Sequence, residues 1–250
     1  MSASVKAHYD THLAPLYSWI YGGAEAARAR FAALLADLNL RPSRPGATAL
    51  DLGAGNGFQS LPLAAAGYTV TAVDLSELLL TELARDAASA GLPIRTVLGD
   101  LRELARHTPT PAPEVIVCLG DTLPHLPSLD DVTQVIRDAA TALAPGGHLL
   151  LSFRDYSVAR TGTDRFIPVR SDPDRIFTCF LDYGPEKILV HDLVHTRAAG
   201  EWRMAVSAYE KLRLPPAFIR EQLALAGLII TRDTAQNGLV TFVARQPSVS

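Results

Sequence analysis

Cysteine is scarce in this 250-residue chain, which contains only Cys118 and Cys179. Their wide separation excludes a disulfide framework and a zinc ribbon, so we expect two core thiols in a protein from a reducing compartment. No stretch reaches the roughly 18 apolar residues that span a bilayer, and the N-terminus has no apolar core of a secretory signal. The sequence therefore predicts a cytoplasmic protein without a membrane partner.

Positive charge is not in excess either. The chain has 23 Lys and Arg residues against 26 Asp and Glu residues, for a formal net charge of −3. Nucleic-acid binders carry a basic surface that neutralises phosphates, so we expect no nucleic-acid partner. Apolar residues make up 48% of the chain, enough for one sizeable core.

Signals for metal or covalent chemistry are also weak. His191 and His195 lie four positions apart in what looks like a strand, which separates them by about 13 Å. One zinc ion with bonds of about 2 Å cannot bridge that gap. His8 and His12 have no completing acid or thiol, and there is no GxSxG nucleophile motif. We expect no metal and no covalent intermediate.

Strand-like and helix-like runs alternate along the first part of the chain. This alternation predicts an α/β fold with a doubly wound parallel sheet, whose ligands bind at the carboxyl ends of the strands. The predicted strands are 48–52, 68–73, 94–98, 115–119 and 148–153, and the predicted helices are 24–38, a stretch ending at 66, 76–90 and 130–143.

Period-2 patterns replace this alternation after Arg154. Antiparallel strands are predicted at 175–181, 187–196 and 201–212, before a helix at 216–226 and two terminal strands at 228–232 and 239–244. We therefore expect one domain with a Rossmann-like seven-stranded sheet. Its predicted parts are an N-terminal helical lid (1–46), a core (47–155 and 213–250) and an antiparallel β insertion (156–212).

Chemistry-bearing residues follow three of the predicted strands. Gly53 and Gly55 form a turn that opens a helix, although Phe58 replaces the third glycine of a dinucleotide fingerprint. Asp74 follows the next strand, 19 positions after Gly55, where an acid can bind ribose hydroxyls, and Asp100 follows the third strand. The alternative is that the glycines form a plain turn between strand and helix and that the two acids only cap helices or turns. Together the three positions predict a nucleoside ligand lying across the sheet.

These segments resemble the class I S-adenosylmethionine-dependent methyltransferases. The similarity covers most of the chain through LDLGAGNG, VDLS, GDL and LAPGGHLLLSF. Within that superfamily, VIVCLGDTLPHLP, FRDYSVARTG and SAYEKLRL resemble the glycine N-methyltransferase group. The resemblance implies S-adenosylmethionine as cofactor, S-adenosylhomocysteine as product and a small-molecule acceptor.

The resemblance also implies which residues contact the cofactor. The glycine turn would pass beneath the methionine portion, the two acids would contact ribose and adenine, and an entry-helix arginine would reach the cofactor carboxylate. The residues carried over are Gly53, Ala54, Gly55, Asp74, Leu75, Asp100, Leu101, Leu119 and Arg28.

Five further residues are predicted to act in catalysis, three of them from the resemblance. Arg154 would pair with a substrate carboxylate, for which a planar guanidinium is well suited. Asp121 stands where the group has Asn, so it would bind or deprotonate an amine, and strict glycine specificity is not expected. The rings of the N-terminal segment would line a lid around the cofactor's sulfonium, as cation–π attraction favours, unless they only pack on the sheet; they belong to Tyr9, Tyr17, Trp19 and Tyr21. Tyr209 matches one of the group's two active-site tyrosines, whereas Ala208 replaces the other.

The function expected from this resemblance is methyl transfer to the amine of an amino acid or related compound. Three alternatives share the cofactor motifs. They are a natural-product O- or C-methyltransferase, an enzyme that uses the aminobutyryl chain of the cofactor in an internal alkylation releasing methylthioadenosine, and a non-catalytic sensor. Strand edges in the insertion can also pair subunits, which would give a homo-oligomer.

Overall fold

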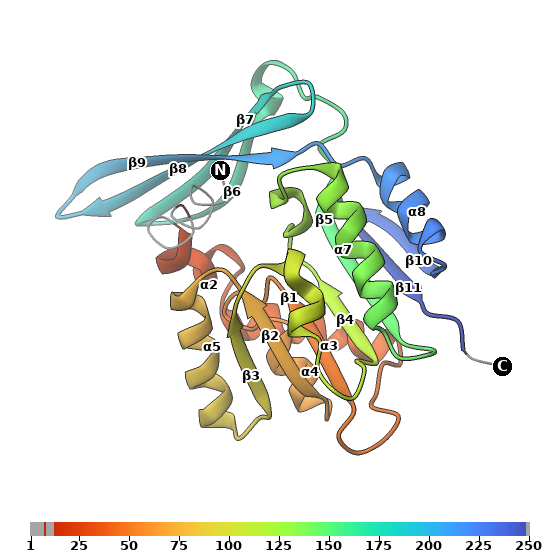
Figure 1. Cartoon of the computed structure of the whole chain (residues 1–250). Helices are drawn as coiled ribbons and strands as arrows, with labels where there is room; N and C mark the ends of the chain where they lie inside the picture. Colours follow the sequence, from red (N-terminus) through yellow and green to blue (C-terminus); the bar gives the residue numbers. More distant parts are fainter. Residues whose placement is uncertain (1–7, 9–12, 249–250) are drawn as a thin grey trace.

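The computed structural model describes residue 8 and residues 13–248, which form two sheets. A seven-stranded sheet lies at the centre of the fold, and a four-stranded antiparallel sheet lies across one end of it (Figure 1). In the described residues, no helix combines the length and apolarity needed to cross a membrane.

The seven-stranded sheet has the order β10-β11-β5-β4-β1-β2-β3. Strands β1 to β5 pair in parallel, and β11 is antiparallel to both of its neighbours. This arrangement confirms the predicted doubly wound sheet. The strands are β1 (Thr48–Leu52), β2 (Thr69–Asp74), β3 (Ile94–Leu98), β4 (Val115–Cys118), β5 (His148–Arg154), β10 (Ile229–Gln236) and β11 (Leu239–Arg245).

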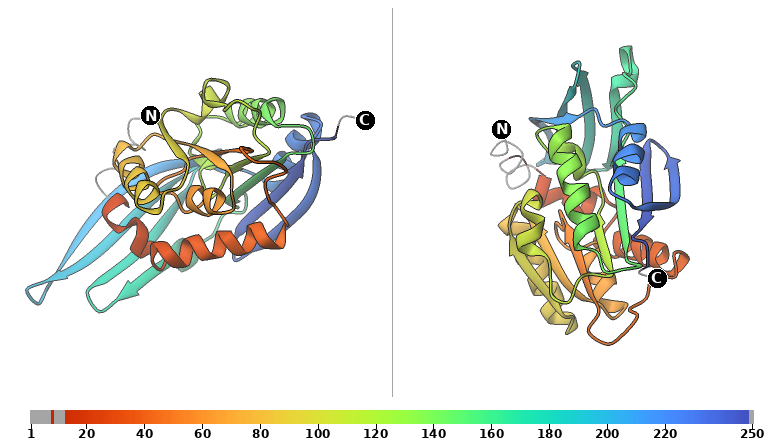
Figure 2. Two further views of the ribbon diagram at one scale, coloured as in Figure 1. Left: turned by 90° about the horizontal axis from the view of Figure 1, so that it is seen from below. Right: turned by 45° about the vertical axis from the view of Figure 1, so that its right-hand side comes forward.

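The central strands are apolar because both of their faces are covered. In β4, Ile116 packs into a cluster with helices α7 and α8, whereas Val117 packs into another with helix α3. Figure 2 shows helices on both sides of the sheet. The longer helices are α3 (Ala24–Asp37), α4 (Ser60–Ala65), α5 (Glu77–Ala90), α7 (Leu129–Ala142) and α8 (Pro216–Leu225).

Short helical segments connect these elements near the carboxyl ends of the strands. They are η2 (Ala14–Leu16), α2 (Tyr17–Ile20), η3 (Leu101–Glu103), α6 (Leu104–His107), η4 (Leu123–His125) and η5 (Gly162–Arg165).

The antiparallel sheet consists of β6 (Phe166–Asp172), β7 (Arg175–Tyr183), β8 (Lys187–Ala198) and β9 (Glu201–Leu212), in that order. Three of these strands were predicted, and β6 was not. It is a mostly exposed edge strand whose pairing is interrupted after Pro168, so it has no clear period-2 apolar pattern.

Helix α2 contacts the antiparallel sheet and the turn that follows β1. Its Trp19 and Ile20 pack against Phe177 and Val194 of the antiparallel sheet, while Tyr17 stacks on Phe58 of the core. Helix α2 therefore lies at the junction where the ends of β1, β2 and β4 meet the insertion (Figure 1).

Candidate active site

The glycine turn after β1 has a backbone that requires glycine. Gly53 has a φ of +74°, and a Cβ atom there would collide with the Thr122 side chain. Gly55 has a φ of +53° and lies beneath the Tyr17 ring. The amides of Gly53 and Ala54 donate to the Val73 carbonyl at 2.9 and 3.0 Å, which fixes the turn against β2.

Asp74 connects the glycine turn to the start of α5. Its Oδ2 accepts a hydrogen bond from the Gly55 amide at 2.8 Å, and its Oδ1 accepts one from the Ser76 amide at 2.8 Å. The cap of α5 is Ser76, whose Oγ accepts from the Leu79 amide. Asp74 thus lies beside the cap, with its carboxylate at the carboxyl end of β2.

Asp100 follows β3 and is paired with Arg102. The Arg102 side chain donates to Asp100 Oδ2 at 2.6 and 3.0 Å. Burial alone would raise the pKa of Asp100, but the hydrogen bonds and charge of Arg102 outweigh it and hold the pKa below its ordinary value. Asp100 is therefore ionised at neutral pH.

A cavity of about 360 Å³ joins these strand ends to the antiparallel sheet. This volume is within the range of small-molecule sites. One end of the cavity is formed by the glycine turn and the two acids, and the other by η4 and β9. Its lining includes Tyr17, Gly53, Gly55, Asp74, Leu75, Ser76, Asp100, Leu101, Gly120, Thr122, His125, Leu126, Tyr209 and Lys211.

Three aromatic rings cover the glycine turn. Tyr17 stacks on Phe58 with ring centroids 5.5 Å apart, and Tyr21 meets Phe58 edge-on at 5.2 Å. The Tyr21 hydroxyl lies 3.8 Å from where a Cβ of Gly120 would be. The residue that breaks the dinucleotide fingerprint, Phe58, thus provides the surface on which these two tyrosines pack.

Asp51 is a buried acid two residues before Gly53. Its side chain accepts a hydrogen bond from the Ser60 hydroxyl at 2.5 Å. Burial raises its pKa to about 7, and the charge of Asp74 adds to the rise while Ser60 opposes it. Asp51 is therefore expected to gain and lose its proton near neutral pH.

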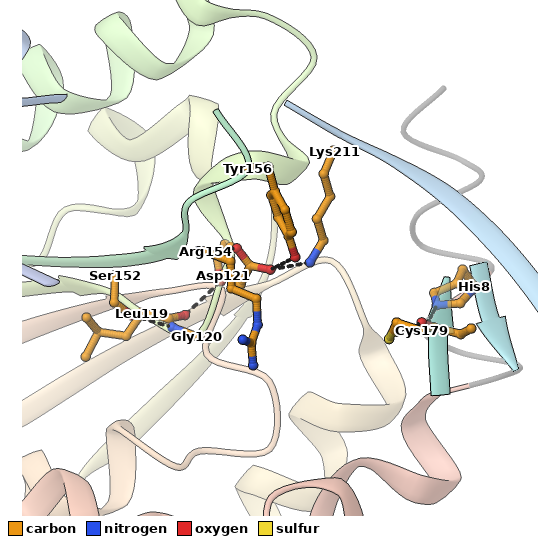
Figure 3. Close-up of polar contacts among 11 residues, drawn as sticks. His8, Leu119, Gly120, Asp121, Ser152, Arg154, Tyr156, Cys179 and Lys211 are labelled. Carbon is orange, nitrogen blue, oxygen red and sulfur yellow. Dashed lines mark hydrogen bonds and ion pairs between the residues drawn. The ribbon is translucent and has the colours of Figure 1, made fainter. Parts of the chain in front are cut away.

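Asp121 forms a buried ion pair with Lys211 of β9 (Figure 3). Asp121 has a φ of +79°, in the left-handed region that Asp tolerates better than most residues. Its carboxylate also accepts from the Arg154 amide at 2.8 Å and from the Tyr156 hydroxyl at 3.3 Å. Burial and the Asp121 charge raise the pKa of Tyr156, so this phenol stays protonated.

Tyr209 lies between two imidazole rings at this end of the cavity. Its ring is 4.2 Å from that of His8 and 5.4 Å from that of His125, centroid to centroid. Burial and the positive charge of Lys211 lower the pKa of His125 well below its usual value. His125 is therefore uncharged at neutral pH.

Comparisons with known proteins agree with this geometry. Residues 49–147 match the family described as "Methyltransferase domain". That segment runs from β1 to the turn before β5 and contains the glycine turn and both acids. The segment 49–147 is thus a methyltransferase domain, and the chain resembles the class I S-adenosylmethionine-dependent methyltransferases. The methyl donor of those enzymes is S-adenosylmethionine, as the resemblance found in the sequence implied.

Relatives of the methyltransferase domain act on different acceptors. The glycine/sarcosine N-methyltransferase of Aphanothece halophytica is 32% identical over 109 residues, which cover 44% of this chain and 41% of that protein. The ubiquinone biosynthesis O-methyltransferase of Marinobacter nauticus is 34% identical over 113 residues, covering 45% and 46%. This chain thus spans less than half the length of either relative.

The solved structure of an S-adenosylmethionine-dependent methyltransferase from Clostridium acetobutylicum shares the fold over the full chain. Its TM-score is 0.72 at 15% sequence identity, with 99% of both chains covered. The similarity therefore includes the antiparallel sheet as well as the methyltransferase domain.

The structure brings part of the predicted site of the methyltransferase domain together. Of the residues named from sequence, the cavity lining contains Gly53, Gly55, Asp74, Leu75, Asp100, Leu101 and Tyr209. Ala54 and Leu119 are buried beside it, and Tyr21 lies over Gly120. Tyr9 falls outside the described residues. The roles assigned to all of them remain predictions.

Two predicted arginines are placed elsewhere. Arg28, on α3, pairs with Asp86 of α5 at 2.6 Å and is not among the described residues that line the cavity. Arg154 contributes to a separate hollow with the β10–β11 hairpin. In Figure 3 its guanidinium lies below the Asp121 carboxylate, whereas Lys211 reaches that carboxylate from above.

Sequence reasoning named Tyr17 as part of the lid but missed the roles of two other residues of the site. Phe58 is the ring on which Tyr17 stacks over the glycine turn, and Lys211 is a buried cation in the cavity wall. One signal for Lys211 was available. In SAYEKL, lysine occupies an alternate position with Tyr209, so both side chains point to the same face of the strand.

Proposed function

We propose that this protein transfers a methyl group from S-adenosylmethionine to a small-molecule acceptor. The observation that carries the proposal is that one cavity is lined both by the glycine turn with the two strand-end acids and by residues of η4 and β9. A donor bound at the first end would present its methyl group toward the second.

The chain offers groups suited to each part of this donor. The glycine turn brings backbone to the cavity wall, because Gly53 and Gly55 line the cavity and Gly53 packs so closely on Thr122 that a Cβ would not fit. Asp74 and Asp100 present carboxylates for ribose hydroxyls and for the adenine amino group, with Leu101 beside the ring. Tyr17 and Tyr21 cover the turn and exclude water.

When bound, S-adenosylmethionine supplies a methyl group already activated by a sulfonium. The chain then has to position the acceptor so that its lone pair bonds to the methyl carbon as the sulfur–carbon bond breaks. Such positioning can supply about 7 to 11 kcal/mol of barrier reduction. An acceptor N–H or O–H must also lose its proton, and because the pKa of His125 is lowered by burial and by Lys211, this proton is expected to leave to water rather than to that imidazole.

The charged residues at η4 and β9 affect which acceptors can bind. An amine of an amino acid or related compound stays a candidate, in line with the glycine/sarcosine N-methyltransferase relative and with the solved sugar N-methyltransferase KedS8. Because Lys211 already pairs with Asp121, an amine acceptor would bind uncharged. The ubiquinone biosynthesis relative supports an oxygen acceptor as the second candidate.

The test is methyl transfer from isotope-labelled S-adenosylmethionine to a panel of amino acids, amines, phenols and carboxylic acids. Mass spectrometry should find S-adenosylhomocysteine together with a labelled small-molecule product. Release of methylthioadenosine would contradict the proposal in favour of the internal alkylation. Tight donor binding without any product across the panel would contradict it in favour of a sensor.

A further inference from the structure

Lys211 is a buried cation in the wall of the cavity. It lies on the inner face of β9, is 5% exposed and lines the cavity together with Tyr209 of the same strand. Its ammonium pairs with the carboxylate of Asp121 (Figure 3). Asp121 is itself 7% exposed, so the pair is shielded from water on the Asp121 side.

The Lys211 ammonium has more hydrogen-bond donors than the acceptors that the described residues offer it. An ammonium carries three N–H donors, and Asp121 is its one hydrogen-bond acceptor among the residues that the structure describes. The other groups around it are the ring faces of Tyr156 and Tyr209, at 5.9 and 5.3 Å from Nζ to the ring centroid, and the uncharged His125. Buried donors are normally satisfied, so the remaining two indicate an acceptor supplied by a ligand.

The positive charge of Lys211 indicates which charge the ligand group carries. The Asp121 carboxylate already accepts from Lys211, Tyr156 and the Arg154 amide. A cationic ligand group would meet the Lys211 ammonium at close range, where like charges repel in a poorly solvated site. An oxyanion would instead receive two charge-assisted hydrogen bonds.

We propose that Lys211 binds an oxyanion of the methyl acceptor, either a carboxylate or a phenolate. This inference rests on the proposed function, since it assigns the acceptor end of the same cavity. It places the acceptor's negative group on Lys211 of β9 rather than on Arg154, which the sequence analysis had named for a substrate carboxylate.

The two sources of an oxyanion have different consequences. A carboxylate held by Lys211 anchors the acceptor while another of its atoms faces the methyl group. A phenolate held by Lys211 is itself the methylated atom, and Lys211 favours its ionised form. Both require the same cation at the same position.

Titration of anions into the full-length protein saturated with S-adenosylhomocysteine tests the inference. The probes are benzoate for the carboxylate, 4-nitrophenol for the phenolate and benzyl alcohol as an uncharged match. We expect benzoate or 4-nitrophenol to bind about tenfold or more tightly than benzyl alcohol, the range expected for a hydrogen bond to a charged group. Bound 4-nitrophenol should ionise at lower pH than the free phenol, as its visible absorbance reports.

Variants of the ion pair provide the controls. Lys211→Met should weaken binding of the preferred anion by about tenfold to a hundredfold, and Lys211→Arg should retain most of it. If Lys211→Met fails to fold, the double variant Asp121→Asn/Lys211→Met replaces it, because it leaves no buried charge without a partner. Arg203→Met removes a positive charge from an exposed site on the same strand and should leave anion binding unchanged.

Each outcome assigns the ligand or overturns the inference. Lys211-dependent binding of benzoate alone indicates a carboxylate, and that of 4-nitrophenol alone a phenolate. Absence of anion binding, or binding that persists in the Lys211 variants, overturns the inference while S-adenosylhomocysteine still binds. If S-adenosylhomocysteine does not bind, the proposed function fails, and the same titration without it decides the Lys211 site separately.

Discussion

Lys211 and Asp121 lie 90 positions apart in the chain and form a buried ion pair beneath the antiparallel sheet. The pair connects β9 to the end of β4, the strand that leads into the acceptor side of the cavity. It therefore ties the position of the insertion to that of the core.

Removing one partner of this pair should destabilise the protein. Lys211→Met leaves the Asp121 carboxylate buried without its cation, which typically costs about 3–5 kcal/mol. Asp121→Asn/Lys211→Met removes both charges and keeps a polar group for the Arg154 amide, so it should cost much less. Urea unfolding of the three proteins measures the difference, and equal losses in the single and double variants would contradict a stabilising pair.

Asp51 should make stability depend on pH. Its pKa is about 7 in the folded protein and about 3.9 in an unfolded chain, so the folded state binds the extra proton between these values. The stability that Asp51 contributes is therefore fully present below about pH 4 and is lost as pH rises through 7, at up to about 1.4 kcal/mol per pH unit.

The measurement for Asp51 is urea unfolding of the wild type and of Asp51→Asn at pH 5 and pH 8. Asn cannot ionise, so the wild type should lose free energy of unfolding relative to the variant as the pH is raised. Parallel pH profiles for the two proteins would show that Asp51 ionises as easily as an exposed acid.

Gly53→Ala should damage the cavity as well as the backbone. Its φ of +74° is unfavourable for Ala, and its new Cβ would collide with Thr122 in the cavity wall. Gly91→Ala is the matched control, because Gly91 has a φ of +63° with open space around it.

Both glycine variants should lose about 1–2 kcal/mol to backbone strain. Only Gly53→Ala should also weaken binding of S-adenosylhomocysteine in calorimetry. A Gly53→Ala protein that binds it as tightly as Gly91→Ala does would show that the turn does not face the ligand.

Phe58→Ala should open the cover over the glycine turn. The substitution removes the surface on which Tyr17 and Tyr21 pack, and truncating a buried Phe costs about 3–5 kcal/mol. Tyr21→Phe keeps the ring and removes only the hydroxyl near Gly120.

The comparison of these two variants separates ring packing from hydroxyl chemistry. If the ring is what matters, Phe58→Ala raises the KM for S-adenosylmethionine and Tyr21→Phe leaves it near the wild-type value. A large fall in kcat for Tyr21→Phe would instead assign the hydroxyl a part in catalysis, as the aromatic N-terminal segment led us to expect.

The parts of the site that the sequence predicted are local. Gly53 and Gly55 follow their strand directly, and Asp74 and Asp100 each end a strand, so parallel topology alone brings them to one edge of the sheet. These positions could be derived without any knowledge of the tertiary packing.

The parts that were missed depend on contacts between distant segments. Nothing near Asp121 indicates that a lysine of β9 reaches it, and nothing near Arg28 indicates its pairing with Asp86 of another helix. Strand β6 was not predicted because it is an exposed edge strand, and such a strand needs no alternation of apolar and polar residues.

The central claim is that the strand-end acids hold an adenosyl ligand in this cavity. Isothermal titration of S-adenosylhomocysteine into the wild type, Asp74→Ala and the control Asp138→Ala, a half-buried acid of α7 outside the cavity lining, tests it most directly. The account predicts one site per chain, with affinity weakened about tenfold or more by Asp74→Ala and unchanged by Asp138→Ala. No binding to the wild type, or equal affinity for Asp74→Ala, would contradict it.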